Sequence, residues 1–208
     1  MPDWKKPLFD RDDVEITRRL TLYKDFFRVD KISLKHRMFE GGWTEDISRE
    51  LFLRGPAVGV LLYDPERDTV ALVEQFRAGA LTGPGSPWCL EVVAGMIEDN
   101  ETPEAVALRE SVEEAGVEPY RLEYIARYLP SPGGSDEVMH ILCGLADLEN
   151  AGGVHGLDEE NEDIKVHVIP VSEVFDNLYS GRFNNASVLL CLQWLQLNHS
   201  RLRGSQTC

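Results

Sequence analysis

The stretch from Gly95 to Val117 constrains the fold of this chain more than any other. Thr102 suits a helix N-cap, because its hydroxyl can accept a hydrogen bond from a free amide of the first turn. Pro103 suits the first helical position, where its missing N–H is no loss, and Gly116 is typical of the residue just after a helix end. The sequence therefore predicts one helix over residues 103–115.

The two faces of this helix are predicted to differ in chemistry. At about 100° per residue, the apolar residues fall on one stripe and the glutamates centre on the opposite side. The stripe consists of Ala105, Leu108, Val112 and Ala115, and the acidic side of Glu110, Glu113 and Glu114. Like charges four residues apart cost roughly a few tenths of a kcal/mol, which a divalent cation would reverse. A solvated acidic face is the alternative interpretation.

The spacing of glycines, glutamates and one arginine in this stretch is specific. Five residues separate Gly95 from Glu101, and seven separate Glu101 from Arg109-Glu110. Two residues then separate Glu110 from Glu113-Glu114, and one residue separates Glu114 from Gly116. This pattern resembles the signature of the Nudix hydrolases. One position departs from it, because the bulky aliphatic usual after Glu110 is Ser111 here. We expect that change to weaken local packing and to leave the metal face intact.

The resemblance implies a reaction, a cofactor and a set of ligands. Nudix enzymes hydrolyse nucleoside diphosphates linked to another group, using Mg²⁺ or Mn²⁺. A pyrophosphate needs such cations, because its oxygens carry full negative charge and its phosphorus is a poor electrophile. Carried onto this chain, the metal ligands would be Glu110, Glu114 and the Ala94 carbonyl, with Glu113 a weaker candidate. Arg109 would orient the glutamates by pairing with them.

A second acidic run, from Asp158 to Asp163, precedes a strand pattern that begins at Ile164. Such a run in a loop is usually solvated surface. In the ADP-ribose pyrophosphatase branch of the family, however, a loop glutamate in this place completes the site. The resemblance thus implies that Glu160 is the catalytic base and Glu162 a further metal ligand, and the exchange of these two roles stays open.

The surroundings of the signature bear on the substrate. Pro132 lies fifteen residues beyond Val117 and resembles the marker of the ADP-ribose pyrophosphatase branch. By position, substrate contacts are implied for Phe26 and Arg49 with adenine, Arg77 with a phosphate, Glu137 with the terminal ribose, and also for Met96 and Gly133. An aromatic ring and a guanidinium can sandwich a base. The ordinary alternatives are surface ion pairs for the arginines and a core position for Phe26.

Two regions are predicted along the chain. Residues 1–55 contain short alternating runs, which predict a small antiparallel sheet, and the resemblance implies that this region is exchanged between two subunits. Residues 56–208 form the catalytic domain in this prediction. Its expected strands cover 57–63, 69–77, 88–94, 125–129, 138–146 and 164–169, with a short helix capped by Ser172 and a last helix over 185–199. Mixed strands with helices between them predict an α/β fold, a Nudix-type α/β/α sandwich around a mixed sheet.

Composition excludes several classes of partner. The formal charge is −15, from 36 acidic and 21 basic residues, so the overall field repels nucleic acid. No apolar run is long enough to cross a bilayer and the N-terminus has no apolar signal segment, so we expect a cytoplasmic protein without a membrane partner. The four cysteines are scattered, and neither a disulfide framework nor a zinc site is expected.

The resemblance therefore implies a homodimeric, metal-dependent hydrolase that splits ADP-ribose into AMP and ribose 5-phosphate. The same chemistry on another nucleotide sugar, such as GDP-mannose, is the first alternative, because base selection depends on few side chains. A non-catalytic Nudix domain that binds a nucleotide sugar is the second. Such proteins tend to have lost the signature glutamates, which this chain keeps.

Overall fold

The computed structural model describes residues 4–157 and 161–204 of the chain. Two compact units are formed, one by Met1–Gly55 with Leu129–Glu137 and the other by Pro56–Tyr128 with Val138–Cys208. Glu160 lies outside the described residues. No helix in the described ranges has both the length and the hydropathy required to span a membrane.

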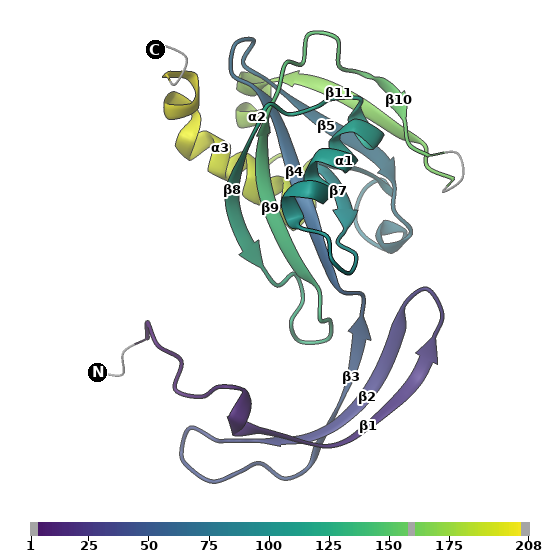
Figure 1. The fold of residues 1–208 in the computed structure, drawn as a ribbon, viewed down its shortest axis with the longest axis vertical. Helices are drawn as coiled ribbons and strands as arrows, with labels where there is room; N and C mark the ends of the chain where they lie inside the picture. The colour runs from purple at the N-terminus through teal and green to yellow at the C-terminus, as the bar shows by residue number, and fades with distance from the viewer. Residues whose placement is uncertain (1–3, 158–160, 205–208) are drawn as a thin grey trace. The chain divides into compact units, whose positions relative to one another are not determined.

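The first unit contains the predicted antiparallel sheet (Figure 1). Its strands, after the short 3-10 helix η1 (Arg11–Asp13), are β1 (Val14–Lys24), β2 (Arg28–His36) and β3 (Ile47–Leu53), in the order β1-β2-β3. The sheet has a buried charge at Asp30, which accepts hydrogen bonds from Arg19, from Thr21 at 2.9 Å and from Arg28 at 2.8 Å. Burial alone would raise the pKa of Asp30, but these partners hold it below its usual value.

The second unit contains one mixed, eight-stranded sheet of order β10-β11-β5-β4-β9-β8, with β6 on β5 and β7 on β4. The strands are β4 (Pro56–Asp64), β5 (Thr69–Phe76), β6 (Trp88–Glu91), β7 (Val93–Met96), β8 (Arg121–Tyr128), β9 (Val138–Leu145), β10 (Gly153–His155) and β11 (Ile164–Pro170). β4 and β9 run parallel, and the other pairs are antiparallel.

The strands β4 and β5 separate along part of their length, and β6 and β7 lie in the sheet between them. Strands β4 and β5 pair only from Leu62–Asp64 to Thr69–Ala71, and beyond that point β5 pairs with β6 while β4 pairs with β7. The single strand predicted over 88–94 is therefore broken at Val92 into two. The break places Ala94 and Gly95 within the sheet, next to β4.

Helices cover both faces of this sheet. α1 (Pro103–Ala115) packs with one hydrophobic core, whereas α2 (Val171–Asp176) and α3 (Ala186–Gly204) pack with the other. Figure 1 shows α1 in front of β4 and β7, and α3 passing behind β8 and β9. The predicted α/β/α sandwich is confirmed.

Two helix ends differ from prediction. α2 begins at Val171 directly after Pro170, so Ser172 lies inside the helix and does not cap it. Pro170, the last residue of β11, takes the N-cap position instead, and its side chain forms no capping hydrogen bond. α3 runs past His199 to Gly204, and Asn185 accepts a hydrogen bond from the Val188 amide at its start.

The predicted apolar stripe of α1 is correct at Ala115 and wrong at Ala105, Leu108 and Val112. Leu108 and Val112 are 39% and 50% exposed, and the buried residues are Val106, Ala107, Ser111, Glu114 and Ala115. Small side chains let this face approach the sheet closely, and the Ser111 hydroxyl is satisfied by the Ala107 carbonyl at 2.6 Å. Ser111 is thus part of the packed face, and Glu114 points inward.

Candidate active site

The ends of α1 fix the register of its glutamates. The Thr102 hydroxyl accepts from the Ala105 amide at 3.2 Å, and Gly116 has the left-handed φ of 65° that favours glycine. Both predicted caps are confirmed. With the ends set, Glu110 and Glu114 lie on the face that packs toward β7, and α1 contacts that strand.

Glu114 is held by the backbone of β7. Its carboxylate is 3% exposed, and Oε2 accepts a hydrogen bond from the Ala94 amide at 3.0 Å. In an extended strand, the N–H and C=O of one residue leave toward the same edge. The Ala94 carbonyl therefore faces the same side as Glu114, as the ligand role predicted for it requires.

Glu110 occupies space that a side chain at position 95 would fill. A Cβ built on Gly95 would lie 1.9 Å from Glu110 Oε1 and 2.3 Å from its Cδ. Glycine is thus required by the close approach of the Glu110 carboxylate to the backbone, while its own φ is ordinary. The requirement for glycine at position 95 thus follows from the position of the Glu110 side chain.

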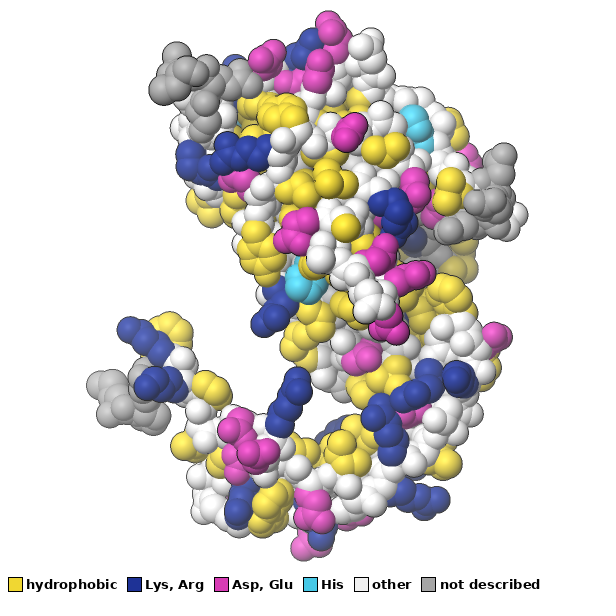
Figure 2. Space-filling model, viewed as in Figure 1, with side chains coloured by type: hydrophobic (Ala, Val, Ile, Leu, Met, Phe, Trp, Pro, Cys, Tyr) yellow, Lys and Arg dark blue, Asp and Glu magenta, His cyan; other side chains and the backbone are white. Residues whose placement is uncertain are grey.

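Arg109 pairs with the glutamates around it. Its guanidinium contacts Glu110 at 2.9 Å, Glu113 at 3.0 Å and Glu101 at 3.7 Å. Glu113 is partly exposed and bound to Arg109, which sets it apart from the two inward-facing glutamates. In Figure 2, acidic and basic side chains lie side by side over the region of α1.

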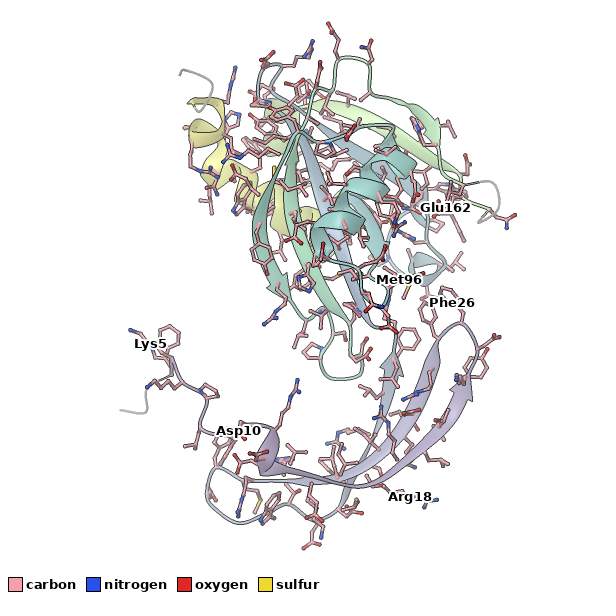
Figure 3. All side chains as sticks on the ribbon, viewed as in Figure 1. Lys5, Asp10, Arg18, Phe26, Met96 and Glu162 are labelled. Carbon is pink, nitrogen blue, oxygen red and sulfur yellow. The ribbon has the colours of Figure 1, made fainter. Side chains whose placement is uncertain are left out.

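Burial and neighbouring carboxylates raise the pKa values of the two inward-facing glutamates, Glu110 and Glu114. Burial raises the pKa of Glu110 to about 7 against the pull of Arg109, with Glu113 and Glu162 adding to the rise. Burial likewise raises the pKa of Glu114 to about 8, against the Ala94 amide, with Glu110 and Glu162 adding to the rise. Figure 3 labels Glu162 just ahead of β11 and Met96 at the end of β7. The charge of Glu162 thus raises the pKa values of both Glu110 and Glu114.

These residues fit a divalent cation. The desolvated Glu110 carboxylate lies over Gly95, the desolvated Glu114 carboxylate is bound to the Ala94 amide, and their oxygens are the hard donors that Mg²⁺ and Mn²⁺ prefer. Within residues 4–157 and 161–204, no three acidic, histidine or cysteine side chains are already grouped at metal-binding spacing. Glu162 instead accepts from the Leu157 amide at 3.3 Å.

The raised pKa values of Glu110 and Glu114 predict how metal-free stability depends on pH. Between the ordinary value of 4.5 and about 7 to 8, the folded chain keeps protons that the unfolded chain has released. The free energy of unfolding should therefore fall as pH rises through this window, by on the order of a few kcal/mol. Urea denaturation in EDTA at several pH values measures it.

The control for this prediction is the double variant Glu110→Gln with Glu114→Gln, which should lose most of the slope. Asp30 and Asp64, whose pKa values are lowered, act only at more acidic pH and do not confound the window. Added Mg²⁺ should raise the unfolding midpoint more at the basic end, because protons compete with the cation. A wild-type slope equal to that of the double variant would contradict the prediction.

Arg77, directly after β5, is held by a residue that sequence reasoning missed. Its Nε donates to Glu91 Oε2 at 2.8 Å, and its Nη2 forms an ion pair with the same oxygen at 2.8 Å. A carboxylate inside the apolar run of residues 88–94 could have signalled this, because a charged residue in a buried strand is expected to be paired. On β5, the buried Nε2 of Gln75 has no hydrogen-bond partner among the described residues.

The other predicted substrate contacts are divided between the units. Phe26, Arg49, Gly133 and Glu137 belong to the first unit, whereas Arg77 and Met96 belong to the second. Phe26 is 81% exposed in the turn between β1 and β2, against Phe27 at 4.7 Å between ring centroids. Arg49 donates to the Ser48 carbonyl at 2.8 Å, and Glu137 pairs with Arg54 at 3.3 Å. Phe26 is thus not a core residue.

Comparison with known proteins connects this arrangement to a family. The NUDIX domain model matches residues 53–190. An ADP-ribose pyrophosphatase of Haemophilus influenzae is 44% identical over 213 residues, covering 99% of this chain and 98% of the relative. One of Escherichia coli is 44% identical over 203 residues, covering 98% and 97%.

Two further similarities are more distant. A GDP-mannose pyrophosphatase of Escherichia coli is 30% identical over 191 residues, covering 88% of this chain and 98% of the relative. A solved structure of an ADP compounds hydrolase superposes with a TM-score of 0.66 at 21% identity, covering 89% of this chain and 96% of the other. The latter likeness establishes the shared fold.

Proposed function

Because this chain belongs to the Nudix family, we propose that it hydrolyses the pyrophosphate of ADP-ribose to AMP and ribose 5-phosphate. One observation carries the proposal: Glu110 and Glu114 converge on Gly95 and Ala94, inside the matched segment. The substrate follows from relatives that are named ADP-ribose pyrophosphatase and match over nearly their whole length.

The cofactor in this proposal is Mg²⁺, with Mn²⁺ as a substitute. Glu110, Glu114 and the Ala94 carbonyl would hold it, with Glu162 as a further ligand. When bound, the cation supplies charge neutralisation for the diphosphate and a lowered pKa for its water. Arg109 forms ion pairs with both Glu113 and Oε1 of Glu110, and thereby orients these two side chains.

The remaining roles fall to residues around this centre. Glu160 is the base in our proposal. Glu162 is the alternative, because it lies only two positions further along the chain, before the start of β11 at Ile164. Arg77 binds a phosphate through the guanidinium edge that Glu91 leaves free. Phe26 and Arg49 enclose the adenine, Glu137 contacts the terminal ribose, and Met96 and Gly133 line the substrate through their backbone.

We also propose that the enzyme is a homodimer. β1 is exposed along its whole length and carries apolar side chains that water disfavours, namely Val14, Ile16, Leu20, Leu22 and Tyr23. An exposed apolar edge strand of this kind is suited to cover by a second copy. Exchange of the first unit between subunits would bring Phe26 and Arg49 to the partner's site.

The test of function is a product assay with purified protein, ADP-ribose and Mg²⁺ in ¹⁸O water. We expect AMP and ribose 5-phosphate in equal amounts, no reaction with EDTA, and label in one product that identifies the attacked phosphorus. GDP-mannose is the second substrate to assay, because a relative of that name is 30% identical. Absence of AMP with full turnover of GDP-mannose would replace the first function by the second.

A further inference from the structure

A chain of polar contacts runs from the start of α3 to Arg77. Asn185 accepts from the Val188 amide at 3.1 Å through Oδ1 and thereby caps α3. Its Nδ2 lies 3.4 Å from Glu91 Oε1 and 3.4 Å from the Leu90 carbonyl. Glu91 in turn accepts from Arg77 through its other oxygen. The two oxygens of one mostly buried carboxylate thus connect a helix cap to an arginine.

The geometry of the Arg77 pair leaves half of the guanidinium available. Nε donates to Glu91 Oε2 at 2.8 Å, and Nη2 lies 2.8 Å from the same oxygen as its ion-pair partner. Both contacts lie on one edge of the guanidinium, and within the described residues its side chain forms no other hydrogen bond. An arginine fixed on one edge by a carboxylate can present its other edge to a phosphate in a defined orientation.

The carboxylate of Glu91 therefore fixes the direction in which the other edge of Arg77 points. A guanidinium released from Glu91 would regain its side-chain freedom and lose its orientation toward the substrate phosphate.

We propose that Glu91, held by Asn185, is a positioning residue that fixes Arg77 for the substrate phosphate. The inference rests on the proposed function, because it takes the diphosphate of ADP-ribose as the group that Arg77 binds. It adds two residues, on β6 and at the start of α3, that touch neither the substrate nor the metal. Their effect must therefore pass through Arg77.

A double-mutant cycle tests this dependence. Glu91→Gln should raise the KM for ADP-ribose about 10-fold with a smaller change in kcat, as expected for loss of one charged hydrogen-bond pair. In the Arg77→Ala background, the same substitution should change KM by less than about 2-fold, because residues that act through one another are not additive. A purely structural role would give equal costs in both backgrounds.

Asn185→Ser and Glu74→Gln complete the design. Serine retains the cap of α3 but cannot reach Glu91, so KM should rise by roughly 3-fold without loss of the folded helix. Glu74, in β5, is the matched control, because it forms an ion pair of the same kind with Arg182. Its carboxylate also contacts His167 at 2.8 Å. Glu74→Gln should leave KM unchanged.

Each outcome of the cycle supports or overturns the inference. Non-additive costs for Glu91→Gln and Arg77→Ala, with Glu74→Gln silent, support it. Additive costs in a wild-type enzyme that hydrolyses ADP-ribose overturn it and leave the proposed function intact. Absence of both turnover and calorimetrically measured ADP-ribose binding in the wild type overturns the proposed function, and the inference with it.

Discussion

Replacing Glu114 by glutamine is expected to lower Mg²⁺-dependent turnover of ADP-ribose by roughly two to three orders of magnitude. Glutamine has the same shape and keeps an oxygen for the Ala94 amide, which donates to Glu114 at 3.0 Å. It removes only the negative charge that a cation requires of a ligand. Steady-state kinetics over a range of Mg²⁺ concentrations measures the loss and shows whether excess metal restores part of it.

The stability of the same variant should move in the opposite direction. At about pH 8 in EDTA, the wild type holds a carboxylate that is 3% exposed and whose pKa is raised to about 8. Removing that charge should leave the free energy of unfolding unchanged or raise it by about 1 kcal/mol. Loss of activity together with unchanged or greater stability identifies a ligand, whereas loss of both would indicate a structural role and contradict the prediction.

Glu113→Gln is the matched control on the same helix. Glu113 is partly exposed and pairs with Arg109 at 3.0 Å. Its replacement removes one surface ion pair, which stabilises by about 0.3–0.5 kcal/mol at most. Turnover should therefore change much less than in Glu114→Gln. A loss as large as that of Glu114→Gln would make Glu113 a ligand and require a different arrangement of the cluster.

Local signals in the sequence predicted the ends of α1 correctly, but the direction in which the helix faces depends on packing. Thr102, Pro103 and Gly116 act within one turn of the chain, so their roles follow from residue type alone. Periodicity placed Leu108 and Val112 in the core because it weighs side chains by hydrophobicity. The structure packs Ala107 and Ser111 against the sheet instead, since small residues allow close approach and the site requires Glu114 inward.

The candidate site shows the same division between local and long-range information. Glu110 and Glu114 could be predicted because four residues of helix place them together. The contact of Arg77 with Glu91 depends on the opening of the β4–β5 hairpin, and that of Glu91 with Asn185 joins residues far apart in sequence. Such contacts have no short-range signal beyond a charged residue in an apolar strand.

The second large effect is expected for Gly95→Ala. The added methyl group would lie 1.9 Å from Glu110 Oε1, so the carboxylate must leave its position over the backbone. Because the atoms displaced belong to a flexible side chain and the φ of Gly95 is ordinary, the cost in stability should stay near 1 kcal/mol. Turnover should fall by roughly 100-fold, since a ligand displaced by an ångström no longer completes the site.

Gly79→Ala controls for an added methyl group as such, because a Cβ at Gly79 meets no atom within 4 Å. The decisive comparison is made in the Glu110→Ala background. If Gly95 is required only by the Glu110 carboxylate, then alanine at 95 meets empty space there and costs neither activity nor stability beyond the first substitution. If the same loss persists without Glu110, the methyl group obstructs something else at the strand, and the requirement for glycine belongs to the backbone of β7.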